Sequence, residues 1–192
     1  MSGDMIEIVN YQKSWPGEFL RLGKVLRRAL GDLALRIDHI GSTSVPGLAA
    51  KDIIDIQVTV AHLEPDVEEA LKRAGYTRHD AITQDHIPPG STSSQENWAK
   101  WLFKPPDSQR PTNLHVRKAG HANQRYALLF RDYLRAHPAT AQAYARLKMR
   151  LAEYLADPKM YPEVKDPAVD LIYLPAEEWA AAVGWEPGPS GC

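Results

Sequence analysis

The alternation of apolar and polar side chains predicts two β-strands in the first third of the chain. In residues 35–40, Leu35, Ile37 and His39 alternate with Arg36, Asp38 and Ile40. In residues 54–60, β-branched residues alternate with Asp55, Gln57 and Thr59. A period of two is typical of strands, because successive side chains point to opposite faces. We therefore expect Asp55, Gln57 and Thr59 to share the face opposite the core.

Other segments repeat apolar residues at helical spacing, with Ser or Pro near their starts and Gly or Pro near their ends. The helical segments predicted in this way are 14–31, 65–75, 121–138, 138–155 and 166–173. We expect Pro175 to end the last helix and to begin a fresh turn through Trp179, because proline has no backbone N–H to donate.

The remaining segments are shorter. Residues 6–9, 98–104 and 112–117 have the composition of strands, the last with Asn113, His115 and Arg117 on one face. Pro, Gly and Ser in residues 85–94 disfavour regular structure, which indicates either a lid over a site or an ordinary surface loop.

These elements predict an α/β (α+β) fold, a mixed β-sheet flanked by helices and followed by a helical C-terminal region. The length of 192 residues suits one domain. We expect a core in residues 1–120, a helical part of the same domain in 121–184, and a disordered tail in 185–192, where Gly and Pro dominate.

Composition narrows the classes of function. The 23 basic and 24 acidic residues nearly balance, so no basic field indicates a nucleic-acid partner. Cys192 is the only cysteine, which excludes an intramolecular disulfide and agrees with a reducing, cytoplasmic location. We expect neither a membrane span nor a signal peptide, because no apolar run has the required length and the first residues lack a basic segment.

The turn between the two predicted strands offers the first candidate chemistry. Gly41 lets the backbone approach a ligand closely, and Ser42, Thr43 and Ser44 add three hydroxyls beside backbone N–H groups. Such a loop can hold a phosphate. The alternative is that the hydroxyls only cap the segment that follows.

The run from His39 to Ile56 (HIGSTSVPGLAAKDIIDI) resembles the signature of the GrpB-like family, a branch of the nucleotidyltransferase superfamily. Other blocks on both sides of this run are similar to further family motifs and come in the same order as in the family. The resemblance therefore covers residues 6–172. These blocks are 11–19, 113–116, 130–138 and 144–148. An ordered set of blocks is far more specific than any one of them.

The resemblance implies metal-assisted transfer from a nucleoside triphosphate to an acceptor. Superfamily enzymes carry a Gly-Ser turn, two carboxylates one residue apart on a strand, and a third on a later strand, all serving divalent metal. Asp55 matches the first carboxylate, but Gln57 stands at the second and His115 at the third. This set supplies one negative charge, so it could hold one Mg²⁺ or Mn²⁺ with the nucleotide phosphates, take Zn²⁺ through His115, or hold no metal.

Several further residues are candidates for catalysis or for binding phosphate or substrate. We expect Asp55 to be a metal ligand or base and His115 to assist it, although a strand carboxylate and a packing histidine are the structural alternatives. The cations could neutralise a triphosphate or could form a solvated helix face. The binding candidates are His39, Gly41, Ser42, Thr43, Ser44, Lys51, Gln57, His86, Arg131, Arg135, Lys148 and Lys165.

Three functions remain open on the sequence. The first is the transferase just described, and the second is a nucleotide- or coenzyme A-binding module that lost metal chemistry with the carboxylate absent at Gln57. Similar family members occur fused to dephospho-coenzyme A kinase, which suggests a role near coenzyme A metabolism. The third is a transferase or ligase that uses the same pocket for another activated acyl or phosphate group.

Overall fold

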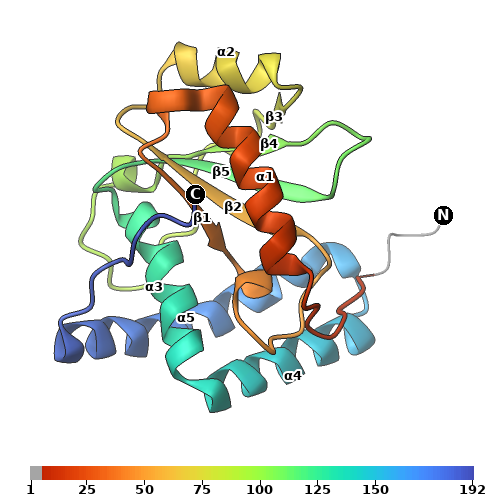
Figure 1. The fold of residues 1–192 in the computed structure, drawn as a ribbon. Helices are drawn as coiled ribbons and strands as arrows, with labels where there is room; N and C mark the ends of the chain where they lie inside the picture. The colour runs from red at the N-terminus through yellow and green to blue at the C-terminus, as the bar shows by residue number, and fades with distance from the viewer. Residues whose placement is uncertain (1–5) are drawn as a thin grey trace.

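The computed structural model describes residues 6–192, and its centre is one five-stranded mixed sheet (Figure 1). The strand order is β1-β2-β5-β4-β3, in which β2 and β5 are parallel and the other neighbours are antiparallel. The predicted mixed sheet is confirmed. The strands are β1 (Arg36–Ile40), β2 (Ile54–Val60), β3 (Thr77–Arg78), β4 (Trp101–Lys104) and β5 (Thr112–Lys118).

Helices cover both faces of this sheet (Figure 1). On one side lie α1 (Trp15–Leu30) and α2 (Pro65–Arg73), each with a proline in its first turn, where a missing N–H costs nothing. On the other side lie α3 (Ala122–Ala136), α4 (Pro138–Tyr154) and α5 (Tyr161–Val183). Four short 3₁₀ turns connect the described elements: Gly31–Leu33, Ser42–Ser44, Gln95–Trp98 and Pro158–Met160.

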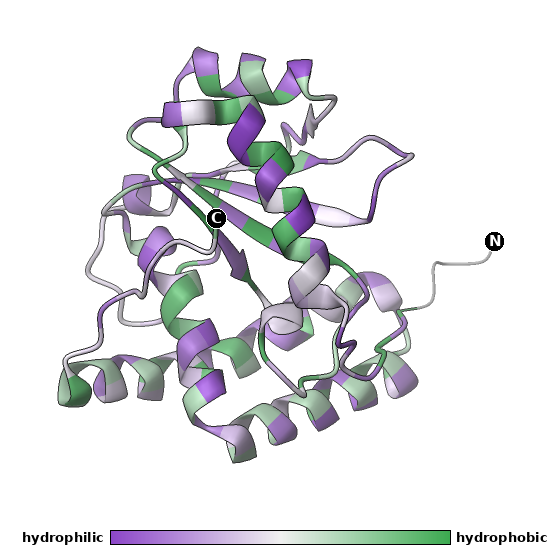
Figure 2. Cartoon of the chain, in the orientation of Figure 1, coloured by the Kyte–Doolittle hydropathy of each residue, from purple (hydrophilic) through white to green (hydrophobic). Residues whose placement is uncertain are grey.

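The apolar residues form two clusters, one on each side of the sheet. The first packs β2 residues such as Ile54 and Ile56 against Trp15 and Leu71, and all four side chains are fully buried. The second lies among the C-terminal helices, around residues such as Leu129. Figure 2 shows the corresponding apolar bands along the central strands and the helices. Because both faces are covered, the polar residues of β2 are mostly buried as well.

The C-terminal helices bury most of the polar face of β2. Asp55, Gln57 and Thr59 share a face, but Gln57 and Thr59 are 0% and 1% exposed. Gln57 donates a hydrogen bond to the Gln124 carbonyl in α3. Only Asp55 of the three is partly open to solvent.

The C-terminal helix departs from the prediction. The sequence predicted a helix over 166–173 that Pro175 would end, but α5 runs unbroken for 23 residues through Pro167 and Pro175. An interior proline costs about 3 kcal/mol. The burial of Ile172, Tyr173 and Ala176 in the second cluster offsets that cost. The prediction of a turn after Tyr173 is therefore wrong.

The segment 185–192 was predicted to be disordered, but the structure places its end along the edge strand β1. Ile37 donates from its N–H to Ser190 Oγ (3.0 Å) and accepts at its carbonyl from the Cys192 N–H (3.1 Å). Arg36 donates to the Gly188 carbonyl (2.7 Å). A sheet edge offers unpaired backbone groups, which compensate for a composition poor in apolar anchors.

A smaller difference concerns the first described residues. The strand-like residues 6–9 form only one bridge, between Val9 and Ala50. Within residues 6–192, no helix has the length and apolar character that a membrane crossing requires.

Candidate functional site

The turn after β1 packs directly on the Asp55 side chain. Gly41 has φ +67°, a backbone conformation that residues other than glycine rarely adopt. A Cβ on Gly41 would collide with the Asp55 carboxylate. Glycine at this position therefore allows the backbone of the Ser42–Ser44 turn to lie against the carboxylate.

Two of the predicted cations hold this turn in place from α3. Arg131 donates to the His39 carbonyl (3.0 Å), and Arg135 donates twice to the Ser44 carbonyl (2.8 and 3.1 Å). Their guanidinium groups also contact Asp132. In the described structure both arginines thus contact backbone at the base of the turn.

His39 contacts both α1 and the turn. Its ring stacks on Phe19 and lies 3.0 Å from Thr43 Oγ1. Burial, together with the positive charges of Arg135 and Arg131, lowers its pKa to about 4, so the ring is neutral at physiological pH. Inside the turn, Ser44 Oγ donates to the Gly41 carbonyl (2.6 Å).

The parallel pairing of β2 and β5 brings the expected partner of Asp55 next to it. Asn113 lies opposite Asp55 and His115 opposite Gln57. Asn113 donates to Asp55 Oδ1 (2.7 Å), and His115 Nε2 lies 3.9 Å from the same oxygen. Sequence reasoning placed Asn113 on this face without assigning it a role.

These neighbours keep Asp55 ionised. Burial alone would raise the pKa of Asp55, but the interactions with His115 and the hydrogen bond from Asn113 outweigh it and lower the pKa. Burial and the charge of Arg117 lower the pKa of His115, so this ring is neutral near pH 7. The pair is therefore a carboxylate beside a neutral imidazole.

Asp55 faces a cavity of about 190 Å³ between the turn and the C-terminal helices, which we call the lysine pocket. Its cations come from three different segments of the chain. The residues that line it are Ser42, Thr43, Ala50, Lys51, Ile53, Asp55, Asn113, Tyr144, Lys148, Tyr161, Pro162 and Lys165. Six predicted site residues are thus brought together, and Tyr144 and Tyr161 join them without having been candidates.

Lys165 repels the other two lysines of the pocket. Burial, followed by the charge of Lys165, lowers the pKa of Lys148 to about 7, against the opposing effect of Asp55. The same two causes lower the pKa of Lys51. Lys51 lies over the Tyr161 ring and Lys148 over the Tyr144 ring. One carboxylate thus faces three basic groups, which leaves the pocket suited to an anion.

Gln57 does not face the lysine pocket. Its Oε1 accepts from Arg117 Nη1 (2.6 Å), and Arg117 also pairs with Asp85 (2.8 and 2.9 Å). Lys100 donates to the same carboxylate (2.6 Å). A buried polar network thus occupies the position that the resemblance assigns to a second metal carboxylate.

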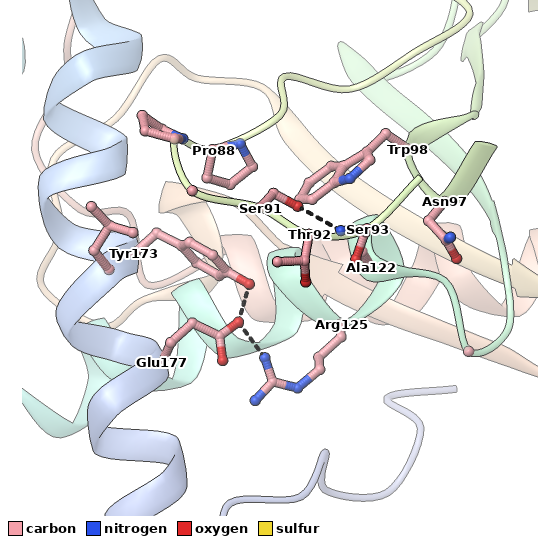
Figure 3. A pocket seen from close by; sticks show the side chains of 14 residues that line it. Pro88, Ser91, Thr92, Ser93, Asn97, Trp98, Ala122, Arg125, Tyr173 and Glu177 are labelled. Carbon is pink, nitrogen blue, oxygen red and sulfur yellow. Dashed lines mark hydrogen bonds and ion pairs between the residues drawn. The ribbon is translucent and has the colours of Figure 1, made fainter. Parts of the chain in front are cut away.

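His86 also lies apart from the lysine pocket. It contacts Asp170 of α5 (2.9 Å) and precedes a loop that borders another cavity, of about 390 Å³. Figure 3 shows that cavity between the Pro88–Ser93 loop and α5, with Glu177 between Tyr173 and Arg125. No predicted site residue lines it. The loop therefore borders a different cavity from the one at Asp55.

The donor set does not fit a pair of divalent metal ions. Asp55 is the only carboxylate of the pocket, and its Oδ1 already accepts from Asn113. Within residues 6–192, no three His, Cys, Asp or Glu side chains are grouped to hold a metal ion. Magnesium prefers several oxygen ligands, whereas lysines near a lone carboxylate oppose a dication.

Comparison with known proteins gives consistent results. A family model described as GrpB protein matches residues 5–174. A dephospho-CoA kinase from Mycolicibacterium paratuberculosis is 39% identical over 95% of this chain and 48% of that protein. The chain thus spans about half the length of the dephospho-CoA kinases it matches. A UPF0157 protein from Halalkalibacterium halodurans is 36% identical over 78% of this chain and 70% of that protein.

A solved structure shares the fold. The crystal structure of conserved protein GrpB from Enterococcus faecalis superposes with a TM-score of 0.69 and 28% identity. The superposition covers 90% of this chain and 99% of that chain.

Proposed function

The chain belongs to the GrpB family, and on that premise we propose that its lysine pocket binds the phosphate groups of a nucleotide or a related small molecule. The observation that carries the proposal is the charge of the pocket, in which Lys51, Lys148 and Lys165 surround a single carboxylate. Burial lowers the pKa values of Lys51 and Lys148 most, and repulsion by Lys165 adds to it; an anion entering the pocket would offset that repulsion.

The turn supplies a second set of donors for the same anion. Within the described residues, the backbone N–H groups of Ser42 and Thr43 donate no hydrogen bond. Both residues line the lysine pocket. Successive free N–H groups in a turn are a common way of binding phosphate, and lysines add charge without demanding a fixed geometry.

The proposed binding needs no divalent metal, because the protein's own cations offset the phosphate charge. Metal-assisted transfer from a nucleoside triphosphate is the second candidate. This transfer reaction is favoured by the ionised Asp55, whose carboxylate lies against Gly41. In that case Mg²⁺ or Mn²⁺ would neutralise the phosphates, and Asp55 would be its one protein carboxylate.

The relatives suggest one ligand class to include in a test. The matched dephospho-CoA kinases are named for a substrate that carries phosphate groups. Coenzyme A and its precursor therefore belong beside nucleoside triphosphates as ligands of the lysine pocket.

A thermal-shift titration with nucleoside triphosphates, coenzyme A and inorganic phosphate, each with and without Mg²⁺ or Mn²⁺, tests the proposal. A ligand that binds only the folded state at a hundred times its dissociation constant adds about 2.7 kcal/mol. Lys165→Gln removes one pocket cation, and Lys159→Gln, at an exposed position outside the pocket, is the matched control.

We expect a metal-independent shift that Lys165→Gln reduces and Lys159→Gln leaves unchanged. A shift that requires metal and is lost in Asp55→Ala would instead favour the transferase. The absence of any shift with all of these ligands would overturn the phosphate-binding proposal.

A further inference from the structure

Lys148 and Ser42 form a contact that phosphate binding alone does not require. The Nζ atom of Lys148 lies 2.8 Å from Ser42 Oγ, although 106 residues separate the two in the chain. Lys148 is 3% exposed, whereas Ser42 is partly open and lines the lysine pocket. A buried amine in hydrogen-bond contact with an accessible hydroxyl is the arrangement of a nucleophile beside its base.

The amine is also held in one orientation. Lys148 Nζ donates to the Ala49 carbonyl and lies over the Tyr144 ring, 4.6 Å from its centroid. Of the two hydrogen-bond partners of Lys148 Nζ, Ser42 lines the lysine pocket and Ala49 does not. A base oriented by a third group completes the pattern found in activated serine nucleophiles.

From this geometry we infer that Ser42 is a nucleophile and Lys148 its general base, forming a dyad that hydrolyses an activated acyl compound carrying a phosphate. The inference rests on the proposed function only for the phosphate, which Lys51 and Lys165 would hold. An acyl phosphate is the smallest member of this substrate class.

The step balances without a further reactant besides water. Ser42 Oγ bonds to the carbonyl carbon while its proton passes to the neutral Lys148 amine. The carbon–oxygen bond to the phosphate then breaks, and the proton passes to the leaving phosphate. Water attacks the acyl-serine and gives one proton to Lys148. The bond between the carbonyl carbon and Ser42 Oγ then breaks, Lys148 returns the proton to Ser42 Oγ, and the carboxylic acid leaves.

The turn can stabilise the negative charge that develops on the carbonyl oxygen. The N–H groups of Ser42 and Thr43 donate no hydrogen bond within the described residues and flank the nucleophile. Backbone N–H groups at the nucleophile and its neighbour are the usual donors to such an oxyanion.

The charged groups around Lys148 determine when the amine is neutral. Burial and Lys165 from α5 lower its pKa to about 7, whereas Asp55 from β2 raises it. Lys51 lines the same cavity, and the pKa of Tyr161 is raised by burial to about 12, so this phenol stays neutral. An amine that is largely neutral at about pH 8 can accept the serine proton.

Labelling with a fluorophosphonate, which reacts with activated serines, tests the nucleophile without requiring phosphate binding. The full chain is treated between pH 6 and 9, and the adduct is located by peptide mass spectrometry. Ser42→Ala removes the nucleophile, and Lys148→Arg keeps a donor but removes the base, since a guanidinium stays protonated. Ser91→Ala, at an exposed serine outside the pocket, is the control.

We expect one adduct, at Ser42, that forms faster as the pH rises through 7. It should be absent in Ser42→Ala, slowed about 100-fold or more in Lys148→Arg, and unchanged in Ser91→Ala. Melting curves establish that each variant is folded. An unlabelled wild type, a label elsewhere, or a folded Lys148→Arg that labels at the wild-type rate would overturn the dyad.

Acetyl phosphate and p-nitrophenyl acetate then separate the dyad from the phosphate site, since only the first carries a phosphate. Lys165→Gln should slow hydrolysis of acetyl phosphate at least tenfold more than hydrolysis of the nitrophenyl ester, whose pH profile should move to higher pH because Lys148 loses a neighbouring positive charge. If the wild type labels at Ser42 but binds no phosphate, the dyad stands and the proposed function fails. If it binds phosphate but is not labelled, the proposed function stands and the dyad fails.

Discussion

Gln57 Oε1 accepts a hydrogen bond from Arg117 Nη1, 2.6 Å away, at the position where the superfamily resemblance implies a metal carboxylate. The Gln57 amide also donates to the Gln124 carbonyl, so both ends of this fully buried side chain are satisfied. The side chain joins β2 to β5 and α3. A structural role therefore accounts for every contact that Gln57 makes.

Replacing Gln57 by Ala should therefore lower stability. The change removes the acceptor of Arg117 Nη1 and one donor to the Gln124 carbonyl in a buried environment, while Asp85 still pairs with Arg117. We expect the free energy of unfolding to fall by about 2 kcal/mol. Urea denaturation measures it, and unchanged stability with altered ligand binding would mean that Gln57 belongs to the site.

Asp85 should control stability at acid pH. Burial would raise the pKa of Asp85, but Arg117 and Lys100 outweigh it and hold the pKa well below its usual range. A carboxylate with a depressed pKa in the fold stabilises above the unfolded pKa of about 4 and loses that contribution as the pH falls below it. Asp85→Asn should cost about 3 kcal/mol at pH 7, because two cations stay buried without their counter-charge.

The pH dependence distinguishes this network from surface charge. The wild type should lose stability between pH 4 and pH 2 more steeply than Asp85→Asn does, measured as melting temperature against pH. Asp80→Asn, whose side chain is 86% exposed, is the control and should follow the wild type. Parallel curves for Asp85→Asn and the wild type would refute the assignment.

Gly41→Ala should both destabilise the fold and disturb the pocket. The new Cβ meets the Asp55 carboxylate and φ at +67° is strained for alanine. Gly47→Ala is the matched control, because Gly47 has φ +78° but nothing within 4 Å of its Cβ position. Strain alone should cost about 1 kcal/mol at Gly47 and clearly more at Gly41, as measured by thermal unfolding. Equal losses would show that the contact with Asp55 is unimportant.

Local pattern predicted the elements that carry this site. The period of two in residues 54–60 predicted β2, and the family motif predicted that Gly41, Ser42 and Asp55 lie together. The expectation that His115 assists Asp55 requires β5 to lie beside β2, and the structure shows that the two strands are neighbours.

Features that depend on tertiary packing were not predicted from the sequence. Nothing local shows that Arg131 and Arg135 bind backbone carbonyls 92 and 91 residues away, whereas Lys148 reaches the pocket itself. The continuation of α5 through Pro175 depends on burial against other helices, which outweighs the local preference of proline. The sequence alone does not distinguish a helical cation that binds backbone carbonyls from one that lines a pocket.

His86→Ala should leave the lysine pocket intact. His86 contacts Asp170 and its side chain is 42% exposed, so the loss in stability should be within about 1 kcal/mol. Phosphate affinity should match the wild type, while hydrogen exchange of residues 85–94 should increase because the loop loses its contact with α5. A large loss of phosphate affinity would return His86 to the site.

Lys148 should make stability rise with pH above neutrality. Its pKa is about 7 in the fold, whereas an unfolded lysine titrates near about 10.4. Between these values the unfolded chain binds the extra proton, so raising the pH favours the fold by up to about 1.4 kcal/mol per pH unit. The difference in unfolding free energy between the wild type and Lys148→Met should therefore increase from pH 7 to 10. A flat difference would mean that the buried amine keeps its proton, and Ser42 would then lack its base.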